Sequence, residues 1–233
     1  MSRGFGKKKT EESDNFVFNL HVVENKLKTW FPDLTVEQLA PILFYAANLV
    51  KFNNSLNLIS QSSIRNMESV HIGDAILGSR LLFPKLVPNQ PVYDFGSGNG
   101  IPGLVFGVLY PQIPVVLLDR DQRKMEFCKH VVAGKNLNNI SVKIGAIEDL
   151  GDGSVFNALS RGFAPLPRAL MATRKVIARG GKYFHFKGDG WANELASMPS
   201  QLFSYWTPSL LGQYRLPDTN TDMSLVLTEK TAE

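Results

Sequence analysis

The chain has 233 residues, of which 44% are hydrophobic and 20% are charged, a composition typical of a packed globular protein and not of a disordered chain. No apolar run is long enough to span a bilayer, and residues 1–10 lack the apolar core of a secretory signal. The single cysteine, Cys128, excludes an internal disulfide and contributes to no metal-ligand set, so we expect a cytoplasmic protein without a metal or a membrane partner.

The formal net charge of +4 is unevenly distributed along the chain. Residues 1–10 contain four basic side chains and no acid, and residues 120–187 contain 13 Lys and Arg against 5 Asp and Glu. A basic face on an otherwise balanced protein favours a polyanionic partner. Charge alone is equally compatible with ordinary solvated helix faces.

The first part of the chain is predicted to be helical after a short polar arm. Residues 1–13 are predicted to form a disordered basic arm, and residues 14–90 a helical N-terminal extension. Apolar side chains recur at three-to-four spacing over residues 16–27 and again over residues 39–50, which predicts two amphipathic helices.

Polar residues and prolines punctuate this extension. Thr35 is a suitable N-cap for the second helix, and the polar stretch 53–55 is expected to interrupt that helix. A third helical stretch is expected over residues 64–82. Three prolines then indicate a linker near residues 84–90.

Residues 91–233 change to short apolar runs that alternate with helical stretches. The apolar runs predict strands over 92–95, 115–118, 140–144, 156–159 and 182–186, with helices over 122–135 and 166–178. This alternation predicts an α/β fold with a doubly wound, mostly parallel sheet. Residues 203–211 and 223–228 lack a helix between them, which predicts an antiparallel pair at the C-terminal edge of the sheet.

The strongest motif follows the first predicted strand and opens a helix; it reads DFGSGNGIPG over residues 94–103. Glycines at alternate positions, Gly96, Gly98 and Gly100, let the backbone turn sharply and let a ligand approach it. Ser97 lies within this loop, and Pro102 suits the first turn of the following helix.

Two cofactor classes use such a loop. An acid at the end of the next strand, Asp119, is placed to accept hydrogen bonds from ribose hydroxyls in either class. The run from Gly98 to Gly103 also fits the dinucleotide fingerprint of an oxidoreductase. Asp94 favours S-adenosylmethionine, because a carboxylate there would repel a pyrophosphate and suit the cationic amino acid part of the methyl donor.

Several motifs in order along the chain resemble the GidB family, also called RsmG. They are Asn57-Leu-Ile-Ser60, His71-x-x-Asp74, the loop at 94–103, Ser160-Arg-Gly-Phe-Ala164 and Lys187-Gly188. The resemblance implies a Rossmann-like class I methyltransferase that uses S-adenosylmethionine. It also implies transfer to N7 of a guanine in small-subunit (16S) ribosomal RNA, with that RNA or the assembled small subunit as partner.

The resemblance also implies roles for particular side chains. Three are expected to be catalytic: Arg161, His71 and Asp74, with Arg161 also beside the cofactor. Ile147 and Glu148 are expected to flank the adenine, and three residues are expected to contact RNA: Arg123, Lys124 and Lys187. The structural alternatives are an ion pair for Arg161, a helix-packing pair for His71 and Asp74, and an ordinary surface lysine at 187. The chain departs from the family pattern at Val70 and Ala146, where members usually carry arginine.

The implied reaction needs no general base, because N7 of guanine has an in-plane lone pair and no proton to lose. The rate must then come from alignment and exclusion of water. Two other functions are compatible with the residues alone: a non-catalytic RNA-binding protein with a vestigial nucleotide pocket, and an NAD-linked oxidoreductase. We expect a monomer.

Overall fold

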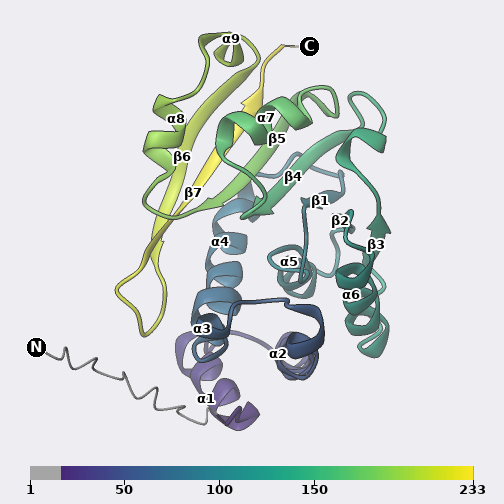
Figure 1. The fold of residues 1–233 in the computed structure, drawn as a ribbon, viewed down its shortest axis with the longest axis vertical. Coiled ribbons are helices and arrows are strands. Elements are labelled where there is room, and N and C mark those ends of the chain that lie inside the picture. The colour runs from purple at the N-terminus through teal and green to yellow at the C-terminus, as the bar shows by residue number, and fades with distance from the viewer. Residues whose placement is uncertain (1–16, 233) are drawn as a thin grey trace, which may run out of the picture.

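The computed structural model describes residues 17–232, so the predicted basic arm at 1–13 lies outside the described residues. A sheet with strand order β3-β2-β1-β4-β5-β7-β6 forms the centre of the described part (Figure 1). Its strands are β1 (Val92–Phe95), β2 (Val115–Asp119), β3 (Ile140–Ile144), β4 (Val155–Arg161), β5 (Ile177–Lys187), β6 (Trp206–Arg215) and β7 (Asp222–Lys230).

The pairing directions confirm the predicted doubly wound sheet. β3, β2, β1, β4 and β5 are parallel to one another, and β7 pairs antiparallel with both β5 and β6. The predicted antiparallel pair at the C-terminal edge is therefore confirmed. Because the order changes direction at β1, the loops after β1 and β4 lie beside the crevice where open α/β sheets bind ligands.

Helices cover both faces of the sheet. They are α1 (Leu20–Trp30), α2 (Val36–Leu56), α3 (Gln61–Ile64), the π-helix η1 (Glu68–Gly73), α4 (Asp74–Leu82), the 3₁₀ turn η2 (Phe83–Lys85), α5 (Gly103–Leu109), α6 (Gln122–Gly134), the 3₁₀ turn η3 (Ile147–Asp149), α7 (Leu166–Thr173), α8 (Trp191–Ala196) and α9 (Ser200–Phe203). One core cluster joins the helices α1, α2, α4, α5 and α6 to the sheet, and a second joins η3, α7 and α9 to its other face.

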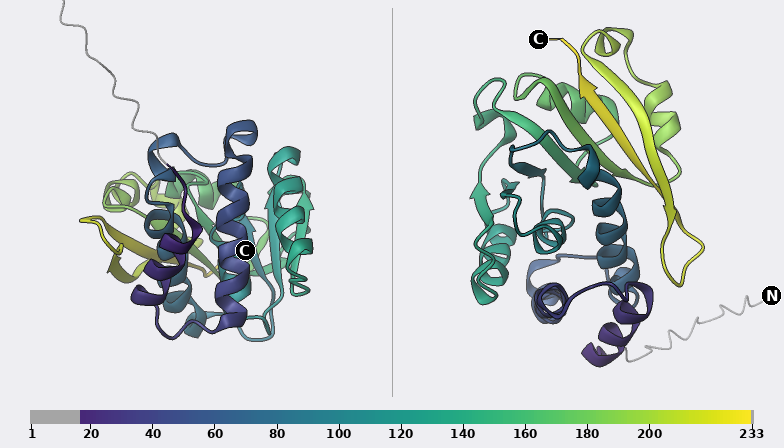
Figure 2. Two further views of the ribbon diagram at one scale, coloured as in Figure 1. Left: turned by 90° about the horizontal axis from the view of Figure 1, so that it is seen from below. Right: turned by 180° about the vertical axis from the view of Figure 1, so that it is seen from behind.

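The N-terminal helices share their core with the sheet. Leu27 of α1 and Ile42 of α2 are fully buried in the cluster that also contains Phe106 of α5 and Phe127 of α6. Figure 2 shows α2 running beside α6, and Figure 1 shows α1, α2 and α3 gathered at one end of the molecule. The segments before and after the predicted domain boundary at residues 90 and 91 therefore share one hydrophobic core.

The second helix starts as predicted and ends later than predicted. Thr35 caps it together with Gln38, so the predicted N-cap is confirmed. The interruption predicted at 53–55 is wrong, because α2 continues to Leu56. Asn53 faces inward, where its side-chain amide exchanges two hydrogen bonds with the backbone of Ile59 (2.8 and 3.1 Å).

Two other helical predictions need correction. The stretch predicted over residues 64–82 is divided into α3, the π-helix η1 and α4. The helix predicted over 166–178 ends at Thr173, because β5 begins at Ile177.

Candidate active site

A cavity of about 390 Å³ opens at the carboxyl ends of the parallel strands. Its lining comes from the loops after β1, β2, β3 and β4: Gly96, Gly98, Leu118, Asp119, Arg120, Lys124, Gly145, Ile147, Glu148, Gly162 and Phe163. Five of the residues predicted to bind the cofactor are in this set: Gly96, Gly98, Asp119, Ile147 and Glu148. We call this space the cofactor cavity.

The glycine loop leaves room that side chains would fill. Gly98 has φ +53°, and a Cβ there would meet only the carbonyl oxygen of Gly96, at 3.8 Å. Gly96 has φ +68°, and a Cβ there would come within 2.6 Å of the ring of Phe163. Both backbone conformations favour glycine. A side chain at 98 would therefore occupy the open cavity, and one at 96 would displace Phe163.

Asp119 connects the end of β2 to the glycine loop. One carboxylate oxygen accepts a hydrogen bond from the Gly98 N–H (2.8 Å), and the other accepts one from the Asp121 N–H (2.9 Å). Each carboxylate oxygen can accept a second hydrogen bond. The partly exposed carboxylate therefore keeps acceptor capacity for the ribose hydroxyls of a nucleoside.

Asp94 is not among the residues that line the cofactor cavity, and its expected contact with the cofactor stays a prediction. Its side chain is buried, and Oδ2 accepts a hydrogen bond from the Gly103 N–H (2.8 Å) at the start of α5. Oδ1 is buried without a hydrogen-bond partner among the described residues. Burial raises the pKa of this carboxyl to about 8, so its charge is suppressed at neutral pH.

Three other loop residues lie behind the cofactor cavity and not in its lining. Ser97 accepts a hydrogen bond from the Leu118 N–H (2.9 Å) and donates one to the Asp94 carbonyl (2.8 Å). Gly100 faces Cys128, and Pro102 is buried at the N-cap of α5. These residues shape the loop, and the structure gives none of them a surface toward the cofactor cavity.

Arg161, Asp74 and His71, predicted as one catalytic set, do lie together. The Arg161 Nε is 3.1 Å from Oδ2 of the fully buried Asp74, and Tyr214 of β6 donates a hydrogen bond to Asp74 Oδ1 (2.7 Å). The ion pair predicted as the structural alternative for Arg161 is thus present. Arg161 is not in the cavity lining, but it directly precedes Gly162, which is.

Two buried nitrogen atoms of this set lack hydrogen-bond partners among the described residues: Nη1 of Arg161 and Nε2 of His71. His71 lies in the π-helix η1, an irregularity common at functional sites. Burial, reinforced by the positive charge of Arg161, lowers the pKa of His71 to about 3. Its imidazole is therefore neutral at physiological pH and is a weak base.

Both of the expected adenine contacts, Ile147 and Glu148, line the cofactor cavity. Ile147 is buried in η3, and Glu148 is exposed and paired with Arg120 (2.7 Å). Lys124, expected to contact RNA, instead lines the cofactor cavity and lies 3.9 Å from Asp121.

The other two expected RNA contacts already have protein partners. Arg123 donates a hydrogen bond to the carbonyl of Ser55 (2.6 Å). Lys187 donates to the carbonyl of Ala164 (3.0 Å) and pairs with Glu194 (2.7 Å), and its side chain is only 13% exposed. A phosphate contact by Lys187 would require this ion pair to break, so the structure favours a structural role for it.

Sequence reasoning missed part of the site. Among the cavity lining, Gly162, Phe163 and Gly145 stood within recognised motifs, whereas Arg120 was not predicted as a site residue. Tyr214 was missed because it is 140 residues from Asp74 in the chain. Within residues 17–232, no helix is long and apolar enough to cross a membrane, and no group of three metal-ligating side chains is found.

Solved structures share the fold at low sequence identity. The YcgJ protein from Bacillus subtilis superimposes with a TM-score of 0.53 at 14% identity, covering 70% of this chain and 100% of that chain. Precorrin-6y C5,15-methyltransferase from Geobacter metallireducens gives a TM-score of 0.52 at 11% identity, covering 75% and 91%. The predicted Rossmann-like methyltransferase fold is thus confirmed.

Sequence comparisons are more specific. The family model for GidB, rRNA small subunit methyltransferase G, matches residues 38–207. Ribosomal RNA small subunit methyltransferase G 3 of Bdellovibrio bacteriovorus is 39% identical over 211 residues, which cover 91% of this chain and 96% of that protein. The Chromobacterium violaceum methyltransferase G is 32% identical over 183 residues, covering 77% and 86%. With the motifs in the predicted order around the cofactor cavity, this chain belongs to the GidB family.

Proposed function

We propose that this protein transfers a methyl group from S-adenosylmethionine to N7 of a guanine in small-subunit (16S) ribosomal RNA. The observation that carries the proposal is the cofactor cavity itself, with its open glycine loop and its strand-end acid, in a chain of the GidB family. The protein acts on the RNA or the assembled small subunit, in the cytoplasm and as a monomer. Residues 91–233 are the catalytic domain, and residues 14–90 are its helical extension.

The residues of the cofactor cavity fit S-adenosylmethionine. The open space at Gly98 accepts a ligand against the backbone, and Asp119 is placed to bind the ribose hydroxyls. Leu118 and Ile147 provide apolar walls for the adenine, and the exposed charges of Glu148 and Arg120 flank its rim. When bound, S-adenosylmethionine supplies a methyl group made electrophilic by the positively charged sulfur.

The chemistry of the acceptor atom, N7 of guanine, determines what the protein must contribute to the reaction. N7 of guanine has an in-plane lone pair that would accept the methyl group, and the base would lose no proton. The protein must therefore align the base and exclude water, and no general base is required. The weak basicity of His71, whose pKa is about 3, supports this.

Arg161 is the residue best placed to orient the guanine. It stands at the end of β4, beside the cavity lining. Its buried Nη1 has no hydrogen-bond acceptor among the described residues. We assign that donor to O6 of the guanine, which leaves N7 free to react. Pairing with Asp74 offsets the charge of the guanidinium, so Arg161 can donate without adding a net positive charge beside a base that becomes cationic.

His71 and Asp74 complete the reactive side of the site. Asp74 is a positioning residue, because it contacts Arg161 and Tyr214. His71 would contact the base through its unpartnered Nε2. Arg123 and Lys124, at the start of α6, would approach the RNA from the opposite side of the cavity, after Arg123 releases Ser55.

Product mapping tests the proposed function. The protein is incubated with isotopically labelled S-adenosylmethionine and either transcribed 16S RNA or small subunits, and the RNA is digested to nucleosides. We expect label in 7-methylguanosine and in no other nucleoside. Label in any other nucleoside would contradict the N7 assignment. Tight RNA binding with no label in either substrate would favour a non-catalytic RNA-binding protein, and calorimetric binding of NAD would favour an oxidoreductase.

A further inference from the structure

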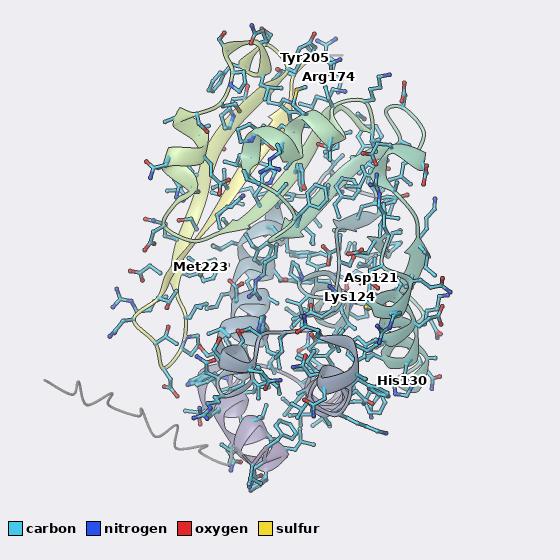
Figure 3. All side chains as sticks on the ribbon, viewed as in Figure 1. Asp121, Lys124, His130, Arg174, Tyr205 and Met223 are labelled. Atoms are coloured by element: carbon cyan, nitrogen blue, oxygen red, sulfur yellow. The ribbon has the colours of Figure 1, made fainter. Side chains whose placement is uncertain are left out.

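A second cavity, of about 640 Å³, lies at the amino-terminal ends of β4 and β5, away from the carboxyl ends that border the cofactor cavity. Its lining contains four basic side chains and one acidic side chain, together with two aromatic rings: Arg174, Lys175, Arg179, Lys230, Asp152, Phe156 and Tyr205. We call this cavity the basic pocket. Figure 3 shows Arg174 and Tyr205 side by side near α9 and the C-terminal end.

Hydrogen bonds and a ring contact hold the floor of the basic pocket, and its rim is exposed. The guanidinium of Arg174 lies 5.0 Å from the centre of the Tyr205 ring. The buried amine of Lys230 donates hydrogen bonds to the carbonyls of Arg174 (2.5 Å) and Ile177 (2.7 Å), which joins β7 to the end of α7. Lys175 and Arg179 are exposed. Their charges face solvent, where a polyanion could reach them.

A third cavity shares lining residues with both the basic pocket and the cofactor cavity. It measures about 500 Å³ and passes the C-terminal end of α7. It shares Asp152, Arg174 and Lys175 with the basic pocket, and it shares Glu148 with the cofactor cavity. The shared residues place the third cavity between the basic pocket and the Glu148 side of the cofactor cavity.

We infer that the basic pocket binds the sugar–phosphate backbone of the structured RNA substrate, at nucleotides outside the one that is methylated. This inference rests on the proposed function. Lys and Arg recognise phosphates without regard to sequence, and such contacts set the position of the RNA on the protein. The planar guanidinium of Arg174, held on Tyr205, suits phosphate oxygens or a stacked base.

The basic pocket draws three of its cations, Arg174, Lys175 and Arg179, from the basic stretch at residues 120–187. Lys187 is held by Glu194, and Arg123 by Ser55, so two of the cations expected to contact RNA are engaged within the protein. Lys175 and Arg179 belong to the same basic stretch and are exposed at the rim. An RNA element that reaches both the basic pocket and the cofactor cavity would bind the basic pocket through its backbone while its target base enters the cofactor cavity.

Charge reversal at the rim tests the inference. Lys175→Glu/Arg179→Glu is compared with Lys28→Glu/Lys51→Glu, which makes the same change in net charge on α1 and α2, at the other end of the molecule (Figure 1). Binding to transcribed 16S RNA is measured over a range of salt concentrations. We expect at least a tenfold loss of affinity at low salt in the pocket variant and less than a twofold loss in the control.

The salt dependence gives a second readout. The slope of log affinity against log salt should fall by about 1.4–1.8 in the pocket variant, because two phosphate contacts are lost. The KM for RNA should rise, while S-adenosylmethionine affinity and the transfer rate at saturating RNA stay unchanged. Lys175→Ala/Arg179→Ala removes the same contacts if charge reversal unfolds the protein.

The outcomes separate this inference from the proposed function. Equal affinities and equal slopes in the pocket and control variants would overturn the inference, and salt-independent binding would point instead to a protein partner. Wild-type protein that binds 16S RNA through the basic pocket but transfers no methyl group would overturn the proposed function alone.

Discussion

Tyr214 donates a 2.7 Å hydrogen bond to Asp74, whose other carboxylate oxygen lies 3.1 Å from the Nε of Arg161. A residue of the C-terminal hairpin thereby fixes an arginine at the end of β4 through an acid at the start of α4. The antiparallel edge of the sheet thus holds the Arg161–Asp74 pair in place, and we propose that it contributes to the site in this way.

Tyr214→Phe tests this connection because it removes only the hydroxyl. The Asp74 oxygen would lose a charge-assisted hydrogen bond, worth about 1.5–3 kcal/mol, and Arg161 would lose its fixed position. We expect a slower single-turnover transfer, with unchanged affinity for S-adenosylmethionine.

Tyr110→Phe is the matched control, because Tyr110 stacks on Phe83 with ring centres 4.0 Å apart, on another part of the core. Its transfer rate should equal that of the wild type. If Tyr214→Phe lost thermal stability but kept the full transfer rate at saturating substrates, Tyr214 would be structural and not a positioning residue.

Gly98→Val should abolish S-adenosylmethionine binding without unfolding the protein. The valine side chain would enter the open cofactor cavity, where a Cβ meets only the carbonyl of Gly96. Gly180→Val is the control, because Gly180 also has a positive φ (+76°) and open space around it. Both variants carry backbone strain of about 1–2 kcal/mol, so calorimetry of the cofactor separates strain from occlusion. Equal cofactor affinities in the two variants would refute the assignment of the loop.

Asp119→Ala should weaken S-adenosylmethionine binding through loss of the ribose hydrogen bonds. Hydrogen bonds to a charged group contribute about 1.5–3 kcal/mol, which corresponds to a loss of roughly tenfold to a hundredfold in affinity. Asp119→Asn should recover part of the loss, because it keeps an acceptor for the Gly98 N–H. Calorimetric titration checks both values, and an Ala variant with wild-type affinity would place the ribose elsewhere.

Asp94→Asn should change how stability depends on pH. The pKa of Asp94 is raised from 3.8 to about 8, so the neutral form is favoured in the folded state. Its contribution is fully present below pH 3.8 and is lost as the pH rises toward 8. The amide of the variant does not titrate and keeps an acceptor for Gly103. The wild type should lose stability between pH 5 and pH 8, whereas the variant should not. The melting temperature of the variant, relative to that of the wild type, should therefore increase over this range. A constant difference would mean that Asp94 is ionised throughout.

Local patterns made much of the fold predictable. The five parallel strands appeared as short apolar runs, and the glycine loop was recognisable because its residues are consecutive. The direction of the Asp94 side chain was not predictable in the same way. Successive strand residues point to opposite faces, and only the packing of α5 decides which of them is covered.

Long-range contacts explain what the sequence could not show. Tyr214 meets Asp74, 140 residues away in the chain, only because β6 folds back beside α4. Lys187 and Glu194 are seven residues apart, but no pattern in the sequence marked them as a pair. The excess of Lys and Arg over residues 120–187 was visible in the sequence. The sequence did not distinguish the exposed cations at the basic pocket from those held in ion pairs.

The central claim is that Arg161 orients the base for a transfer that needs no general base. Its most direct test is the single-turnover rate of methyl transfer to small subunits from pH 5.5 to 8.5, in wild type, Arg161→Ala, Arg161→Lys and His71→Ala. We predict a rate in the wild type without a titration step near pH 6.5. Arg161→Ala should be much slower but still bind S-adenosylmethionine, and Lys should rescue little because it lacks the planar fork. Full activity in Arg161→Ala, or a histidine-like titration that disappears in His71→Ala, would contradict this account.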